Sequence, residues 1–325
     1  MIEFKNVTKV YEDGTEAIKG INLTIPKGKL VALIGPSGCG KTTTMKMINK
    51  LISPSSGTIL INGKDTSKTD EVELRRNIGY VIQRIGLLPH MTIEENISLI
   101  PRLKGWKKEQ YEGRVDELLN LVGLDPEVYR KRYPLELSGG QQQRVGVIRA
   151  LAAEPPIILM DEPFSALDPI SREQLQDELK SIQNAIHKTI VFVTHDIDEA
   201  LKIADEIAVM RDGEIEQIAT PSELLSQPAN EFVRAFIGED RLNARQTQLQ
   251  VIDMMEDNTN YVHYEESEYT SIPYDATVQE AARVLLEAGK PYLMVIKDGK
   301  KTGSVTASGI LRAVASEGKK EARSV

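Results

Sequence analysis

Short apolar runs recur along the first two hundred residues of the chain, with more polar segments between them. Four of these runs cover residues 30–34, 78–82, 157–160 and 189–194. Runs of this length without polar alternation are typical of strands that are buried on both faces, as in a parallel sheet. Residues 114–122 instead carry apolar side chains at helical spacing. The pattern predicts an α/β fold built on a parallel or mixed sheet.

The first apolar run leads directly into a glycine-rich loop, and a segment with helical spacing follows it. The loop, residues 35–42, reads GPSGCGKT and matches the pattern GxxxxGK[ST]. Between a strand and a helix, backbone N–H groups converge on phosphate oxygens, and glycines let the backbone approach closely. Lys41 would bring charge to the β- and γ-phosphates, and Thr42 would ligate Mg²⁺. The predicted nucleotide-binding residues here are Gly35, Pro36, Ser37, Gly38, Cys39, Gly40, Lys41, Thr42 and Thr43.

Acidic residues follow the third apolar run, and a histidine follows the fourth. Asp161 and Glu162 come at the carboxyl end of one predicted strand, and His195 comes at the end of the next. Beside a phosphate-binding loop, Asp161 would hold the magnesium shell and Glu162 would polarise the attacking water. Glu162 and His195 are therefore the predicted catalytic residues.

Cys39 is the single cysteine of the chain, and it lies inside the glycine-rich loop. One interpretation is a small residue at a variable position of the loop. The other is that a thiol among converging amides has some thiolate character. On the second interpretation we expect a thiol alkylator to block nucleotide hydrolysis and bound nucleotide to protect against it.

Two further strings narrow the class of protein that carries such a loop. Residues 137–141 read LSGGQ, and residues 165–168 read SALD. Together with the loop and the acid pair, in this order, they resemble the ATP-binding subunits of ABC transporters, over roughly residues 1–240. The resemblance implies a P-loop NTPase fold with a helical subdomain, ATP and Mg²⁺ as cofactors, and ATP hydrolysis. The LSGGQ string contradicts the alternative of a plain P-loop GTPase or kinase.

The resemblance also implies a role for each motif. The helix N-terminus at the LSGGQ string is an anion site, and Ser138, Gly139, Gly140 and Gln141 would cradle the γ-phosphate of ATP held by a second copy of the chain. Two ATPs would thus lie in a head-to-tail dimer with two-fold symmetry. Further matches are Tyr11 for the aromatic that stacks on adenine, Gln83 for the glutamine that touches Mg²⁺, Asp168 for the loop that crosses the dimer interface, and His195 for the switch histidine. The predicted metal ligands are Thr42, Gln83 and Asp161.

Domain bounds follow from the same resemblance. We expect an ATP-binding domain over 1–240, with a helical subdomain at about 84–138. Within it, residues 87–96 would contact a coupling helix of a separate permease. A linker over 241–253 and a small domain over 254–325 complete the expected organisation.

The C-terminal segment carries its own alternation of helix and strand. Thr277 with Glu280 three residues later predicts a capped helix, and 292–296 and 302–306 predict a β-hairpin with an Asp-Gly turn. A final helix is predicted over 308–316. The order resembles one CBS motif, a small α/β unit that works in pairs and often senses adenine nucleotides.

Thr306 is the candidate ligand residue of this CBS-like unit. Gly309 stands where the CBS family commonly has an aspartate that binds ribose hydroxyls. Structural dimerisation, binding of a nucleotide or cyclic dinucleotide, and sensing of ionic strength therefore stay open as roles.

Composition places limits on partners and location. The 325 residues carry a net charge of −8, which argues against bulk nucleic-acid binding. No apolar stretch is long enough to span a membrane, and the first residues lack the pattern of a signal peptide. We expect a protein at the cytoplasmic face of the cell membrane, held there by a permease.

An ABC ATPase followed by CBS-like sequence resembles the importers of quaternary-amine osmoprotectants such as glycine betaine, carnitine and choline. The resemblance implies a homodimer, a permease and an extracytoplasmic solute-binding protein as partners. The alternatives are an importer of another small solute, such as an amino acid, metal or phosphate, and a non-transport ABC ATPase. The last would need a coiled-coil insertion or two fused ATPase units, and neither is present in this sequence.

Overall fold

The computed structural model divides the chain into two compact units, Met1–Ile237 and Gly238–Val325. Each unit is described by itself. The structure describes residues 1–82, 86–165, 167–242, 251, 255, 270–290, 292–297 and 300–310.

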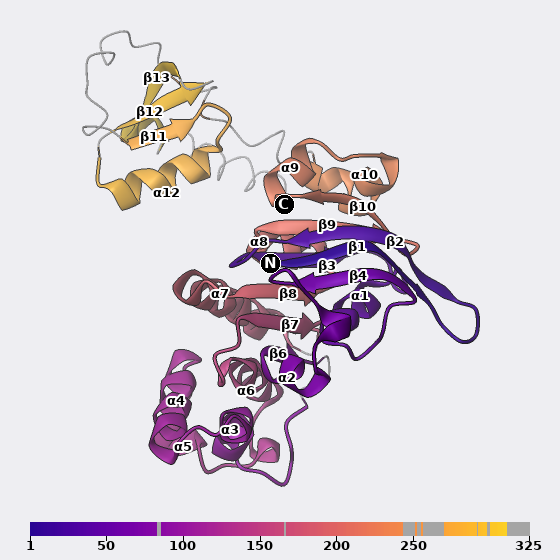
Figure 1. The fold of residues 1–325 in the computed structure, drawn as a ribbon. Helices are drawn as coiled ribbons and strands as arrows, with labels where there is room; N and C mark the ends of the chain where they lie inside the picture. The colour runs from indigo at the N-terminus through magenta and orange to yellow at the C-terminus, as the bar shows by residue number, and fades with distance from the viewer. Residues whose placement is uncertain are drawn as a thin grey trace. The chain divides into compact units, whose positions relative to one another are not determined.

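A six-stranded sheet forms the centre of the first unit, with strand order β10-β9-β3-β8-β7-β6 (Figure 1). All neighbouring pairs are parallel except β9 with β10, which form an antiparallel hairpin at the edge. Every residue of β3, β7 and β8 is buried, so the predicted parallel or mixed sheet is confirmed. The strands are β3 (Leu30–Ile34), β6 (Ile78–Val81), β7 (Ile157–Asp161), β8 (Thr189–Val193), β9 (Glu206–Arg211) and β10 (Glu214–Ala219).

A second, antiparallel sheet has the order β2-β1-β4-β5. In β2, Ile21, Leu23 and Ile25 are buried while the residues between them are exposed, which is the alternation of a sheet with one wet face. Its strands are β1 (Ile2–Val10), β2 (Glu16–Ile25), β4 (Ser56–Ile61) and β5 (Lys64–Asp65).

One hydrophobic core joins the two sheets of the first unit. Leu23 of the antiparallel sheet, Leu33 of the parallel sheet and Met45 of helix α1 (Lys41–Ile48) belong to the same cluster of buried residues. Because α1 starts at the glycine-rich loop and buries its apolar side chains in this core, the loop is anchored at both ends.

Helices α6 to α8 cover the other face of the parallel sheet, α3 to α5 extend its β6 edge, and α9 and α10 lie at its β10 edge (Figure 1). At the covered face, Phe164 meets Phe192 of β8 edge to face at 6.5 Å. Helices α3 to α5 gather beside α6, between Gln83 and the LSGGQ string in sequence. These helices are α2 (Glu71–Arg76), α3 (Ile93–Leu103), α4 (Lys108–Leu121), α5 (Pro126–Tyr129), α6 (Gly139–Leu151), α7 (Pro169–Ile186), α8 (Ile197–Ile203), α9 (Pro221–Ser226) and α10 (Glu231–Ile237), with 3₁₀ turns at Thr66–Lys68 and Pro134–Glu136.

The second unit contains a three-stranded sheet of order β11-β12-β13 with helix α12. Thr277 caps α12 and Glu280 closes the capping box, as the sequence predicts. The hairpin strands pair in antiparallel fashion, while the Asp-Gly turn between them and most of the predicted helix 308–316 lie outside the described residues. The elements are β11 (Thr270–Pro273), α12 (Val278–Ala288), β12 (Tyr292–Lys297) and β13 (Lys300–Thr306).

Membrane-spanning length was tested on the helices of the described ranges. None of them combines the length and the apolar character that crossing a bilayer requires.

Candidate active site

The glycine-rich loop between β3 and α1 takes a conformation that requires glycine at two positions. The φ angles are 147° at Gly35 and 103° at Gly40. A Cβ at Gly35 would overlap the carbonyl oxygen of Met210, and one at Gly40 would lie 2.7 Å from the carbonyl oxygen of Ala17. The loop therefore packs its backbone directly on neighbouring backbone, as a phosphate-binding loop must.

Lys41 folds back into this loop at the start of α1. The residue is 7% exposed, and its Nζ donates hydrogen bonds to the carbonyl oxygens of Gly35 at 2.7 Å and Pro36 at 2.9 Å. Its charge thus lies at the N-terminus of α1, where the helix dipole is also positive. The two together favour an anion at the mouth of the loop.

Thr42 connects the loop to the end of β7. Its Oγ1 donates a hydrogen bond to Asp161 Oδ1 at 3.0 Å. Burial raises the pKa of Asp161 above its ordinary value, and the hydrogen bond from Thr42 opposes that effect. A divalent cation on these two oxygens would favour the charged carboxylate and so would compensate for burial.

Glu162 and His195 face each other at the ends of β7 and β8. His195 Nδ1 lies 3.4 Å from Glu162 Oε1, and the Glu162 N–H donates to the carbonyl oxygen of Val193 at 3.0 Å. Glu162 has a φ of 46°, a left-handed conformation that is uncommon outside glycine. Such strain gathers at functional sites, where the surrounding structure enforces it.

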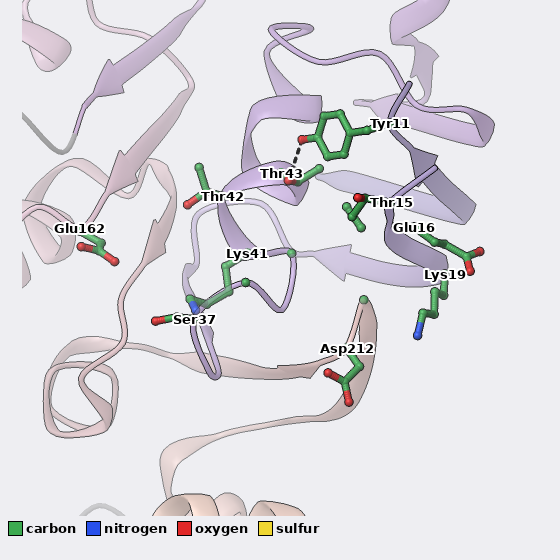
Figure 2. Close-up of a pocket in the computed structure, with 14 residues that line it drawn as sticks. Tyr11, Thr15, Glu16, Lys19, Ser37, Lys41, Thr42, Thr43, Glu162 and Asp212 are labelled. Carbon is green, nitrogen blue, oxygen red and sulfur yellow. Dashed lines mark hydrogen bonds between the residues drawn. The ribbon is translucent and has the colours of Figure 1, made fainter. Parts of the chain in front are cut away.

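A cavity of about 650 Å³ lies over the loop (Figure 2). Lys41 and Thr42 line its centre, Glu162 comes from one side and Tyr11 from the other, as Figure 2 shows. The volume is in the range of small-molecule sites. With a buried lysine and a carboxylate at hand, the site suits binding of a polyphosphate and attack by water.

Comparison with known proteins agrees with this geometry. A family model described as ABC transporter matches residues 18–165. The chain is 53% identical to the glycine betaine/carnitine/choline transport ATP-binding protein of Bacillus subtilis (strain 168), over 91% of this chain and 75% of that protein. The chain belongs to the ABC transporter family.

Two further relatives are similar over most of their length. The carnitine transport ATP-binding protein of Listeria monocytogenes is 55% identical, over 92% of this chain and 73% of that protein. A solved dimeric structure of an ATP-binding cassette in a post-hydrolysis state, bound to ADP and phosphate, superposes with a TM-score of 0.62 at 38% identity. It covers 68% of this chain and 99% of the solved chain. The predicted ABC ATPase fold and the family resemblance are confirmed.

The LSGGQ string of this ABC protein forms the N-terminus of α6. Ser138 caps the helix by accepting a hydrogen bond from the Gln141 N–H at 3.3 Å, and Gln141 Oε1 accepts one from the Ser138 N–H at 3.0 Å. Gln141 also donates to the Tyr129 hydroxyl at 3.0 Å. Ser138, Gly139, Gly140 and Gln141 do not line the cavity over the loop of their own chain.

Asp168 caps α7 in the same manner. Its Oδ1 accepts a hydrogen bond from the Ser171 N–H at 3.1 Å, and hydrogen bonding from the Ser171 hydroxyl, together with that N–H, holds the pKa of Asp168 below its ordinary value. A Cβ built on Gly140 would lie 3.5 Å from Ser171 Oγ, so the starts of α6 and α7 are neighbours within one chain.

Tyr11 lines the far side of the cavity, and its hydroxyl lies 3.1 Å from Thr43 Oγ1 (Figure 2). The ring is 37% exposed, and Lys9 Nζ lies 5.2 Å from its centre. A half-exposed aromatic ring at the end of a phosphate site has the position that adenine stacking needs.

Several predicted residues do not line the cavity. Ser37, Gly38, Gly40, Lys41, Thr42 and Thr43 do line it, whereas Gly35, Pro36, Cys39, Asp161 and His195 do not. Gln83 lies outside the described residues. Thr306 belongs to the second unit, where its Oγ1 accepts a hydrogen bond from the Gly309 N–H at 3.2 Å and lies 3.1 Å from Ser308 Oγ.

Of the two interpretations of Cys39, burial favours a small residue packed at a variable position of the loop and opposes the thiolate. The residue is 3% exposed, and burial raises the pKa of the Cys39 thiol above its ordinary value. The nearby Lys41 ammonium, 3.8 Å from Cys39 Sγ, opposes this shift without overcoming it. The Cys39 side chain belongs to the hydrophobic core cluster of the first unit and does not line the cavity, and sequence order alone could not show this.

Sequence reasoning missed the wall of the cavity that is opposite the loop. It is lined by the end of the β1–β2 connection, by the first residues of β2 and by the β9–β10 turn. The Asp-Gly pair between two apolar runs, here Asp212-Gly213, was a hairpin signal that could have found the turn, but nothing in the sequence indicated its distance from the loop. The missed residues are Thr15, Glu16, Ala17, Lys19, Asp212 and Gly213.

Proposed function

We propose that the chain is the ATP-hydrolysing subunit of an importer for quaternary-amine osmoprotectants, of the glycine betaine, carnitine and choline type. The cavity in which Lys41, Thr42 and Glu162 converge carries the ATPase part of this proposal. The substrate class is supported by the names of the Bacillus subtilis and Listeria monocytogenes relatives.

Mg²⁺ would be held by oxygen donors at the junction of the loop and β7. The Thr42 hydroxyl and the Asp161 carboxylate, 3.0 Å apart, are the oxygen ligands that Mg²⁺ prefers, so the donor set fits this ion. Gln83 is the third proposed ligand. Bound there, the metal would supply neutralisation of the phosphate charge.

Hydrolysis would use Glu162 as the base that orients and deprotonates water. His195 beside it would position the Glu162 carboxylate relative to the γ-phosphate. Because phosphoryl transfer needs mainly positioning and charge neutralisation, Lys41, Glu162 and His195 are a sufficient set when the signature residues of a second copy complete the site.

The second copy is proposed because the LSGGQ residues of this chain do not line its own cavity. Presented to a partner, the α6 N-terminus is an anion site with two glycines and a serine. The dimeric cassette that resembles this chain supports a dimer, and we place Asp168 at its interface as part of the proposal. Transport would further need a permease, contacted through residues 87–96, and an extracytoplasmic solute-binding protein, which would place the chain at the cytoplasmic face of the membrane.

The C-terminal unit is proposed to be regulatory or dimerising. We assign a linker to 241–253 and a CBS-like domain to 254–325, after an ATP-binding domain over 1–240 with its helical subdomain at 84–138. Thr306 is the candidate contact for a nucleotide or cyclic dinucleotide in this domain.

A transport experiment tests the proposal. The chain, reconstituted in proteoliposomes with the permease and solute-binding protein that co-purify with it, should import labelled glycine betaine, carnitine or choline when Mg-ATP is present. Glu162→Gln should bind ATP, lose hydrolysis by at least about 100-fold, and elute as an ATP-dependent dimer.

Two results would contradict it in different ways. ATP-driven uptake of an amino acid, metal or phosphate with no quaternary-amine uptake would replace the substrate class and keep the ATPase. Parental turnover by Glu162→Gln would remove Glu162 from the role of base.

A further inference from the structure

A buried carboxylate lies one turn into α8, directly behind the loop that carries His195. Glu199 is 5% exposed, and burial raises its pKa above the ordinary value. Its Oε2 accepts a short hydrogen bond from the Thr194 hydroxyl. A buried acid is costly unless it is paired, so its neighbours indicate its purpose.

Thr194 links Glu199 to the backbone around His195 through hydrogen bonds. Its Oγ1 accepts a hydrogen bond from the Asp196 N–H at 3.0 Å, and its own N–H donates to the carbonyl oxygen of Leu33 at 3.2 Å. The two residues that flank His195 are thus tied to Glu199 and to the strand that precedes the phosphate-binding loop. The His195 side chain itself is 61% exposed, so it depends on its backbone for position.

Arg172 of α7 approaches the same carboxylate from the other side. Its Nε lies 3.8 Å from Glu199 Oε1, and its Nη1 lies 3.9 Å from Asp196 Oδ2. Its Nη2 donates a hydrogen bond to the carbonyl oxygen of Leu167 at 3.2 Å. One guanidinium therefore contacts both the loop that carries His195 and the residue that precedes Asp168.

These distances leave room for the pair to tighten. Arg172 Nε is buried and has no hydrogen-bond partner among the described residues, although Glu199 Oε1 is only 3.8 Å away. A shift of less than about 1 Å would bring the two atoms to the 2.7–2.9 Å of a charge-assisted hydrogen bond. Movement of Leu167 and Asp168 would carry Arg172 with it, because Arg172 is bonded to that segment through both backbone and side chain.

We propose that Arg172 and Glu199 form a positioning pair that sets His195 against Glu162 and couples it to the segment Leu167–Asp168. The inference rests on the proposed ATPase function, in which Asp168 lies at the dimer interface. Neither residue touches the cavity; both act through the Thr194–Asp196 backbone.

The same two helices offer a matched control. Lys202 of α8 pairs with Asp177 of α7 at 2.8 Å, and this ion pair also joins α7 to α8. Among the described residues, this pair makes no hydrogen bond or ion pair with Leu167 or with Thr194–Asp196. Lys202→Gln therefore removes an α7–α8 contact without removing the proposed coupling.

The experiment compares Glu199→Gln, Arg172→Gln, the double variant and Lys202→Gln in the full-length chain. We expect kcat for ATP hydrolysis to fall about tenfold in each single variant of the pair, the scale seen when an outer partner of a site residue is removed. KM for ATP should stay within about twofold, because the phosphate-binding loop is untouched. The double variant should be no slower than the slower single variant, and Lys202→Gln should match the parent.

A spectroscopic readout separates positioning from stability. The ring proton signals of His195, assigned by their loss in His195→Gln, should shift in Glu199→Gln and in Arg172→Gln and stay in place in Lys202→Gln. If Glu199→Gln melts at a lower temperature than the parent, Arg172→Lys is the second variant. It keeps the charge but loses the forked contacts, so it should show the same loss of kcat with a parental melting temperature.

Each of three results would overturn the inference: parental kcat in both pair variants, an equal loss in Lys202→Gln, or an unmoved His195 signal. Failure of the proposed ATPase activity looks different, since the parent chain would then hydrolyse no ATP. A parent that hydrolyses ATP and is stopped by Glu162→Gln, with fully active pair variants, would remove only the positioning role.

Discussion

Single residues in this site owe their chemistry to direction as much as to identity. Glu162 follows a buried strand, and its left-handed backbone turns the carboxylate toward His195 at 3.4 Å. Asp161, its neighbour, instead receives the Thr42 hydroxyl at 3.0 Å. In our proposal Asp161 therefore binds the metal and Glu162 activates the water. The two adjacent acids differ in role because the backbone turn at Glu162 places their carboxylates in different surroundings.

Cys39 allows a test of the same principle. Because burial raises its pKa, the thiol stays protonated to higher pH, and iodoacetamide should modify the native chain at least about tenfold more slowly than a free thiol at neutral pH. The rate should climb as the pH approaches the raised pKa. Mass spectrometry follows the reaction cleanly because the chain has one cysteine.

The urea-unfolded chain is the control for this measurement and should react at the rate of a free thiol. Complete modification of the native chain within the time that the unfolded chain needs would restore the reactive-thiol interpretation.

At the scale of elements, strand ends and helix starts make the site. The loop leaves β3 and enters α1, the acids end β7, and His195 follows β8. These strands are neighbours in the order β3-β8-β7. Residues more than 150 positions apart along the chain therefore lie together at the carboxyl ends of the strands. Ligand sites of parallel sheets lie at that edge because the strand ends and helix N-termini point there together.

The loop between two of these elements should tolerate no side chain at Gly35. Gly35→Ala should lower the free energy of unfolding by roughly 2–4 kcal/mol and abolish ATP binding, since the new Cβ would overlap the Met210 carbonyl. Urea unfolding and titration with a fluorescent ATP analogue measure the two effects.

Gly63→Ala is the matched control, because Gly63 has a φ of 77° and open space around its Cβ position. It should lose only about 1 kcal/mol and bind ATP normally. Equal effects in both variants would mean that backbone strain, not the close approach at Gly35, sets the loss.

At the scale of the whole molecule, the chain separates into two units with a core each. The core cluster that joins both sheets of the first unit ends at Met210, and the cavity lining ends at Gly213. A separate cluster, with Ile272, Leu293 and Val305 among its members, holds the second unit. Among the described residues, these two clusters have no member in common.

A chain truncated to residues 1–237 should therefore keep ATP affinity and basal ATPase activity within about twofold of the full chain. Coupled ATPase assays and ATP titration on the two chains measure this. Loss of hydrolysis in a truncated chain that still melts cooperatively would show that residues 238–325 belong to the catalytic fold.

Much of the fold was predictable because its signals are local. Runs such as 30–34 and 157–160 need only their own composition to indicate buried strands, and the capping box at Thr277 and Glu280 needs only four residues. The loop at 35–42 was also predictable from local sequence. Its glycines are required by the backbone path between the strand before it and the helix after it.

The rest of the site depended on contacts between distant segments. Lys19 and Asp212 line the cavity because a hairpin of each sheet folds over the loop, and no spacing rule places them there. Cys39 failed as a predicted thiolate for the same reason, because its side chain enters the core.

The amino-acid sequence by itself determined the family, four strands of the parallel sheet (β3, β6, β7 and β8), and the residue types of the phosphate and acid motifs. These follow from short-range pattern, where each residue constrains only its neighbours. Tertiary structure alone decided which way each side chain points, that the LSGGQ residues do not line the cavity of their own chain, and that Arg172 reaches Glu199. Such facts depend on how strands pair and helices pack, and packing is a property of the whole chain.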